Sequence, residues 1–114
     1  QCATIYAAGG ITFTKRSDAR LPFQLCDAIL FLKASLDRAP KDLTPAAFGA
    51  AAAALGNEFQ ASSNFSTFLG PQRVGGPAAA RPMKFDSACE CLTYTGPEEP
   101  LGGVPASAAA GGTA

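Results

Sequence analysis

The chain has 114 residues, of which only 16% are charged, and nine Lys and Arg balance nine Asp and Glu. A chain of this length forms one domain, or part of one, with enough apolar surface for a single core. The balanced charge, without a basic stripe, argues against nucleic-acid binding. Because histidine is absent, this chain alone cannot build Ser-His-Asp or Cys-His catalysis or a His-containing zinc site.

The apolar runs and the first residue of the sequence indicate whether the chain enters a membrane and where it begins. No apolar run approaches the ~20 residues of a membrane helix, since the longest strongly apolar stretch, "AILFLKA", is interrupted by Lys33. We therefore expect no membrane insertion. The sequence starts at Gln1 rather than Met, and we expect it to begin after a cleavage point or within a longer protein.

The first 22 residues predict one helix end and a connection. Residues 2–9 are typical of the end of a helix closed by Gly9 and Gly10, because glycine accepts the left-handed conformation at a C-cap. Residues 11–14 predict a short strand or an extended connector. Residues 15–22 predict a polar link, with Pro22 near the entry of the next helix.

The clearest predicted element is a helix over residues 23–39. Its apolar residues recur at helical spacing and predict a buried stripe, widened by Cys26 and Leu30. The stripe consists of Leu25, Ile29, Leu32 and Leu36. Pro40 ends this helix, since proline cannot continue it.

A second helix is predicted over residues 45–55. Thr44 is a good N-cap, and Pro45 fits the first helical position, where its missing N–H is not needed. Gly56 ends the helix. The two helices together predict a helical hairpin. The buried stripe of the second helix would be Phe48, Ala51, Ala52 and Leu55.

The rest of the chain predicts a loop, a β-hairpin and a tail. Residues 57–81, rich in Gly, Pro and Ser, predict a short strand and a long loop. Alternating apolar and polar residues predict strands over 82–87 and 91–95, with a turn around 87–90. Residues 97–114 lack periodicity and are predicted to be a disordered, low-complexity tail after a segment spanning 1–96.

The four cysteines favour structural disulfides. Zinc sites use C-x2–4-C pairs and redox centres use C-x-x-C, whereas the single close pair here, Cys89 and Cys91, has one intervening residue. A zinc site made of all four thiolates is the minor alternative, and the even count favours an oxidising compartment. Of three possible connectivities, we predict Cys2–Cys26, between two helices, and Cys89–Cys91. The latter lie ~6.6 Å apart along an extended strand, a separation that a turn would shorten.

Four stretches in order resemble the C-terminal part of type 1 periplasmic (solute-binding) proteins. They are "QCATIYAAGGITF", "LCDAILFLKASLDRAPKDLTPAAFGAAAAALG", "FLGPQRVGG" and "KFDSACECLTYT". The helix opened by Asp27-Ala28, the L-T-P start of the next helix and the F-D end of a strand carry the likeness. It covers nearly all of residues 1–96, and the cysteines resemble an actinobacterial-type branch of the branched-chain amino acid ABC transporter class.

The resemblance implies an α/β fold of two lobes joined by crossing strands, of which this chain would be a C-terminal fragment, a helical hairpin followed by a β-hairpin. It implies an extracytoplasmic receptor that delivers a small solute to an ABC permease. No ligand-binding residue is carried over, because most ligand contacts of the family precede this segment. No cofactor and no metal are implied.

The alternatives to a receptor segment are a self-contained small secreted interaction domain stapled by disulfides, and an enzyme. The candidate catalytic or ligand-contacting residues each have a structural explanation. Asp27 lies near the predicted helix start, Asp86 and Glu90 flank the hairpin turn, Arg73 is a loop cation, and Tyr94 is a strand aromatic. We therefore predict no catalytic residue and no enzyme activity.

Overall fold

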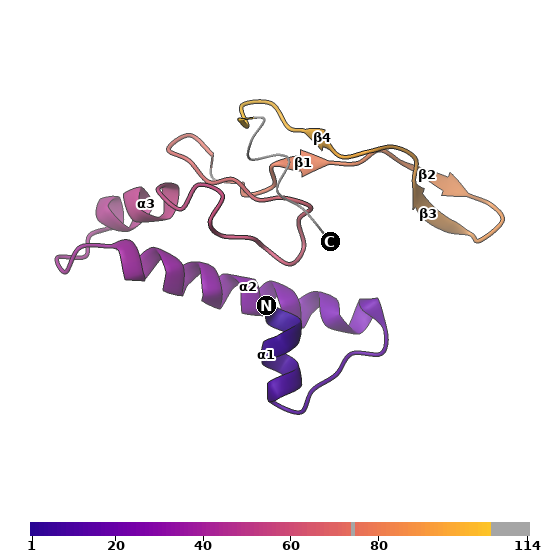
Figure 1. The fold of residues 1–114 in the computed structure, drawn as a ribbon, viewed down its shortest axis with the longest axis horizontal. Helices are drawn as coiled ribbons and strands as arrows, with labels where there is room; N and C mark the ends of the chain where they lie inside the picture. Colours follow the sequence, from indigo (N-terminus) through magenta and orange to yellow (C-terminus); the bar gives the residue numbers. More distant parts are fainter. Residues whose placement is uncertain (74, 106–114) are drawn as a thin grey trace.

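The computed structural model describes residues 1–73 and 75–105 (Figure 1). Three helices are followed by two small antiparallel sheets, an architecture compatible with the α/β class. The helices are α1 (Cys2–Ala8), α2 (Arg16–Arg38) and α3 (Pro45–Ala53). The strands are β1 (Ala79–Ala80), β2 (Met83–Asp86), β3 (Cys91–Tyr94) and β4 (Glu99–Pro100).

The first helix, α1, starts beside α2, runs at a steep angle to it (Figure 1) and is tied to it. Its C-cap, Gly9, has φ −83°, and the glycine with positive φ is Gly10, at +77°. Residues 11–14, for which a strand or connector was predicted, form an irregular connector. The disulfide between Cys2 and Cys26, with Cα atoms 6.0 Å apart, joins α1 to α2. The predicted Cys2–Cys26 disulfide between these two helices is therefore present.

The second helix begins seven residues earlier than predicted. The polar link predicted over residues 15–22 is wrong, because α2 starts at Arg16 and Pro22 lies inside it. Asp18 occupies the first turn, where the helix dipole favours a carboxylate. A proline inside a helix costs about 3 kcal/mol, and contacts with α1 offset this cost. Besides the disulfide, the Tyr6 hydroxyl donates a hydrogen bond to the Pro22 carbonyl at 2.9 Å.

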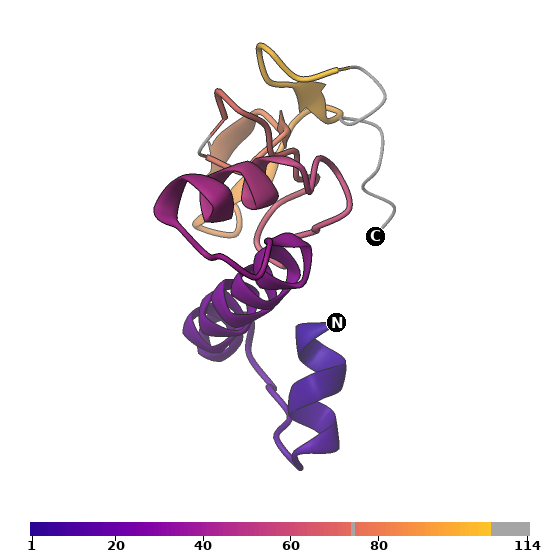
Figure 2. The same cartoon turned by 90° about the vertical axis from the view of Figure 1, so that its left-hand side faces the viewer.

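The predicted burial of the leucine stripe of α2 is also wrong. The buried residues of this helix are Ala19, Cys26, Asp27 and Ser35, whereas the stripe is exposed to solvent. Helix α2 lies between α1 on one side and α3 with the loops that follow it on the other (Figures 1 and 2). Its small and polar side allows these neighbours a close approach, and the leucines are turned away from both.

The third helix has the predicted start. The Thr44 hydroxyl accepts a hydrogen bond from the Ala47 N–H at 3.1 Å, with Pro45 at the first position. Ala51 and Leu55 are buried. Arg38, at the end of α2, donates to the Ala54 carbonyl at 2.9 Å and closes the helical hairpin. Helices α2 and α3 therefore form the predicted antiparallel pair.

The segment after α3 is a long loop tied by its own side chains. Gln60 Oε1 accepts the Thr67 N–H at 3.0 Å, and Thr67 Oγ1 accepts the Ala61 N–H at 3.1 Å. Gln60 Nε2 also donates to the Asn64 carbonyl at 3.1 Å. Thr67 is buried, so these bonds satisfy polar groups that water does not reach.

The prediction of disorder after residue 96 is wrong for β4, which pairs with β1 in the register Ala79↔Pro100 and Ala80↔Glu99. Arg73 supports this pairing, because its guanidinium donates to the Gly102 carbonyl at 2.8 Å and to the Pro77 carbonyl at 2.5 Å. The remainder of the predicted tail, residues 106–114, lies outside the described residues.

The predicted β-hairpin is present, and its turn spans the predicted residues 87–90. Strands β2 and β3 pair from Met83↔Tyr94 to Asp86↔Cys91. Glu90, the last turn residue, has φ 51°. Cys89 and Cys91 form the second predicted disulfide, with Cα atoms 5.2 Å apart, closer than along an extended strand.

The core of the described chain is small. Half of its buried apolar residues are alanines, and the largest fully buried side chains are Cys2, Ser35 and Ser66. Large apolar side chains remain on the surface instead, with Ile29, Phe85 and Leu92 each more than 60% exposed.

Candidate functional site

The first candidate interaction surface is the leucine face of α2, defined by Leu21, Leu25, Ile29, Leu32 and Leu36. These side chains follow one another at steps of four, four, three and four and so share one side of the helix. Each is between 42 and 68% exposed. The opposite side of α2, which includes Ala19, Asp27 and Ser35, is small and polar and is buried against its neighbours. An apolar stripe on a helix is ordinarily covered by another element, so the exposed leucine face is a candidate contact surface.

The second surface is the hairpin face, defined by Met83, Phe85, Leu92 and Tyr94. The register pairs Met83 with Tyr94 and Phe85 with Leu92, so all four side chains lie on one side of the two strands. They are 45 to 64% exposed. The hairpin projects from one end of the molecule, away from the helices (Figure 1). An isolated two-stranded hairpin is marginally stable in water, so this face needs a covering structure.

The base of the hairpin is held against the long loop. The Arg81 guanidinium lies over the Tyr94 ring at 4.7 Å and near the Phe65 ring at 5.7 Å, and the two rings meet edge to face at 5.4 Å. Arg81 Nε also donates to the Gly96 carbonyl at 3.0 Å. These cation–π contacts fix the direction in which the hairpin leaves the rest of the chain. Tyr94, the predicted strand aromatic, is thus part of this anchor.

Asp27 has a different role from the predicted one. Since α2 starts at Arg16, Asp27 lies in mid-helix, where the N-terminal dipole no longer acts. It is 8% exposed, and its carboxylate accepts the Ser62 N–H and the Ser62 hydroxyl, both at 2.8 Å. Its Oδ1 also lies 3.4 Å from the Cys2 sulfur. Asp27 therefore fastens the long loop to α2 beside the first disulfide.

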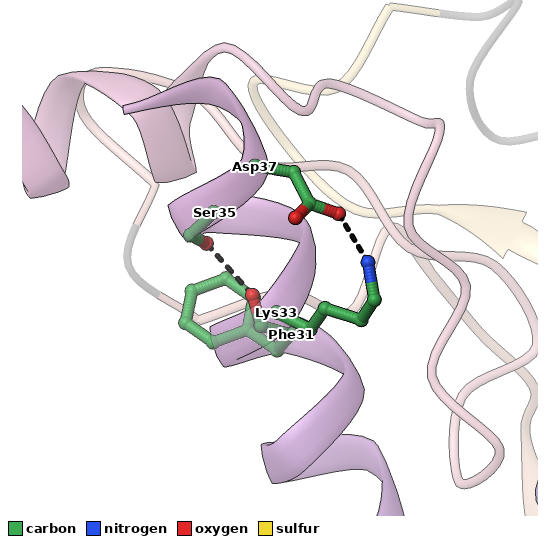
Figure 3. A network of polar contacts seen from close by, with 4 residues as sticks. All are labelled: Phe31, Lys33, Ser35 and Asp37. Carbon is green, nitrogen blue, oxygen red and sulfur yellow. Dashed lines mark hydrogen bonds and ion pairs between the residues drawn. The ribbon is translucent and has the colours of Figure 1, made fainter. Parts of the chain in front are cut away.

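The other polar groups of α2 serve the helix itself. Ser35, fully buried, donates its hydroxyl to the Phe31 carbonyl one turn earlier at 2.8 Å, and Lys33 pairs with Asp37 on the exposed side (Figure 3). Such an exposed pair contributes little to stability. Neither contact leaves a polar group directed at a ligand.

A cavity of about 670 Å³ lies between α3 and residues 69–73. Its wall is mostly alanine and glycine, with Phe31, Leu69 and Arg73. The Arg73 side chain was predicted to be a solvated loop cation, but it is half-buried and holds two backbone carbonyls. Its Nε has no acceptor in the described part of the chain. The cavity thus offers an apolar wall without a set of converging polar groups.

The two hairpin carboxylates are explained by the turn. Asp86 Oδ1 accepts the Ala88 N–H at 2.9 Å, which is the turn-forming role predicted for it. Glu90 occupies the left-handed position of the same turn. Among residues 1–73 and 75–105, no group of three or more Cys, Asp or Glu could hold a metal ion. Both cysteine pairs are disulfides, which form in oxidising environments.

Within the same described residues, no helix has the length and apolarity required to cross a membrane. Comparison of the chain with protein-family models, curated proteins and solved structures found no match. The two uncovered apolar faces are thus the features of this chain that call for a functional explanation. The sequence identified the residues of the leucine face and of the hairpin face. From helical periodicity alone, however, the leucines were expected to be buried.

Proposed function

We propose that this chain is a segment of an extracytoplasmic solute-binding receptor of type 1, and that its leucine face and hairpin face pack against the remainder of that receptor. The observation that carries the proposal is the exposure of both faces in an otherwise folded chain. Large apolar patches on a folded protein mark contact surfaces. The order of helix, helical hairpin and β-hairpin is the order implied by the family resemblance.

In this proposal the complete receptor captures a small polar solute, such as a branched-chain amino acid or a relative, and delivers it to an ABC permease. Capture occurs by closure of two lobes, since a solute that contacts both lobes stabilises the closed state. The present chain contributes support to the fold rather than ligand contacts. The two disulfides are consistent with an oxidising, extracytoplasmic location.

The first test is calorimetric titration of the complete receptor with a panel of amino acids and other small polar solutes. We expect binding by the receptor and none by the isolated chain, because in the proposal the ligand contacts lie on the remainder of the receptor. Micromolar binding or turnover of a solute by the isolated chain would contradict the proposal.

A second test asks whether the leucine face is covered. Ile29→Glu places a charge at the most exposed residue of that face, and Arg20→Glu is the matched control at an exposed position on another side of the same helix. We expect Ile29→Glu to destabilise the complete receptor by about 3 kcal/mol or more, and to have little effect on the isolated chain. Equal effects in both proteins would show that the leucine face has no covering structure.

The alternative function is a self-contained secreted interaction domain. Two disulfides in a chain with a small core are the observation that favours it, since small secreted domains often compensate for a weak core in this way. In that case the apolar faces would bind a separate protein. The Ile29→Glu comparison separates the two functions, because only the receptor proposal predicts destabilisation within one polypeptide.

A further inference from the structure

The two disulfides of this chain lie in opposite environments. Cys2 is 1% and Cys26 7% exposed, whereas Cys89 and Cys91 are both exposed to solvent. The Cys2 sulfur also contacts the buried Asp27 carboxylate. A thiolate must reach a sulfur atom along the S–S axis to exchange with it, so accessibility separates the two bonds. Attack on the first disulfide requires opening of the α1–α2 contact, while the second is open to solvent.

The second disulfide also lies on the side of the hairpin that the proposed contact leaves free. Side chains alternate along β3, so Cys91 points away from the side occupied by Leu92 and Tyr94. Its cross-strand neighbour is Asp86. A structure that covers the hairpin face would therefore leave the disulfide accessible.

Opening of this bond leaves the rest of the fold intact. Cys89 and Cys91 are two positions apart, so the bond closes a very short loop and contributes about half of the loop entropy of Cys2–Cys26 or less. The β2–β3 ladder, from Met83↔Tyr94 to Asp86↔Cys91, and the Asp86–Ala88 turn bond do not depend on it. Cys2–Cys26 instead closes a loop of 24 residues between two helices.

We propose that Cys89–Cys91 is a thiol–disulfide exchange site for an external dithiol, whereas Cys2–Cys26 is a permanent structural bond. One thiolate of the dithiol attacks a sulfur of the pair, the Cys89–Cys91 bond breaks, and a mixed disulfide forms while the other cysteine leaves as a thiolate. The second thiol of the dithiol then attacks the mixed disulfide and frees the attacked cysteine. Two electrons pass to the hairpin and the dithiol becomes a cyclic disulfide. The two protons that the dithiol releases to water are balanced by the two that the cysteine thiolates take up. This inference is independent of the solute-receptor proposal.

The test is reduction of the folded, oxidised chain with dithiothreitol, followed by quenching with N-ethylmaleimide and peptide mapping of the labelled cysteines. Far-UV circular dichroism in the same samples monitors folding. We expect Cys89 and Cys91 to be labelled at least about tenfold faster than Cys2 and Cys26, with unchanged ellipticity. Labelling of all four at one rate, or of the first disulfide before the second, would overturn the proposal.

Two further measurements complete the test. The Cys89→Ser, Cys91→Ser double variant should keep the native ellipticity and lose only the fast labelling phase; persistence of that phase would contradict the assignment. Oxidised dithiothreitol should restore the Cys89–Cys91 bond in the wild-type chain, and failure to do so would exclude reversible exchange. A parallel reaction with reduced thioredoxin distinguishes the source of the dithiol. Reaction with both reagents assigns protein and small dithiols as substrates, and reaction with dithiothreitol alone assigns small dithiols.

Discussion

Replacement of Asp27 by alanine should lower the free energy of unfolding of the chain more than the loss of an exposed polar side chain would. The carboxylate is 8% exposed and accepts two hydrogen bonds from Ser62 at 2.8 Å, one from the N–H and one from the hydroxyl. Two hydrogen bonds to a charged group contribute about 3 kcal/mol together. Alanine favours a helix over aspartate by about 0.6 kcal/mol. The expected net loss is therefore about 2–3 kcal/mol of the free energy of unfolding.

Urea unfolding followed by circular dichroism under oxidising conditions measures this loss, as a lower midpoint with an unchanged slope. Asp37→Ala is the matched control, because it makes the same substitution on the same helix at an exposed ion pair with Lys33. The control should change the free energy of unfolding by less than about 0.5 kcal/mol.

A double-mutant cycle tests the cause. Ser62→Ala removes the hydroxyl bond and keeps the N–H bond, so its coupling with Asp27→Ala should be about 1–1.5 kcal/mol. A loss below about 1 kcal/mol for Asp27→Ala, or strictly additive effects of the two substitutions, would refute the conclusion that this carboxylate holds the loop to α2.

Three further predictions concern the helix cap, the turn and the disulfides. Thr44→Ala removes the N-cap of α3 and should cost about 1 kcal/mol in urea unfolding; Thr44→Ser should retain most of the stability, and equal losses would contradict the capping role. Glu90→Gly relieves the positive φ of the turn and should slow amide hydrogen exchange in the β2–β3 ladder about threefold. Glu90→Ala should not slow it, and a similar gain for alanine would refute the backbone explanation. Joint replacement of Cys2 and Cys26 by alanine should lower the free energy of unfolding by about 3–4 kcal/mol, against about 1.5 kcal/mol for the second disulfide. The reverse order in urea unfolding would contradict the loop-entropy argument.

The features that the sequence alone determined are those that depend on residues close to one another along the chain. The start of α3 was readable because Thr44 and Pro45 satisfy the requirements of a helix N-terminus by themselves. The β2–β3 hairpin was readable because its alternation and its turn lie within fourteen consecutive positions, 82–95. The pairing of Cys89 with Cys91 follows from the same turn, which shortens the distance between them.

The features that only the tertiary structure decided depend on contacts between distant residues. Pro22 suggested a helix start, but contacts with α1 through Tyr6 and the first disulfide allow α2 to continue through it. Helical periodicity located an apolar stripe and could not state what covers it. The neighbours of α2 pack on its small, polar side, and the leucine face remains exposed.

The roles of Asp27 and Arg73 also depend on contacts between residues that are distant along the chain. Asp27 became a buried loop anchor because Ser62, 35 positions away, lies beside it, and Arg73 became a clamp because Gly102 lies beside it. The pairing of β1 with β4 joins residues about twenty positions apart that carry no periodic pattern. Hydrogen bonds between such residues are determined by how the elements pack, and a reading of the chain by local spacing contains no information on that packing.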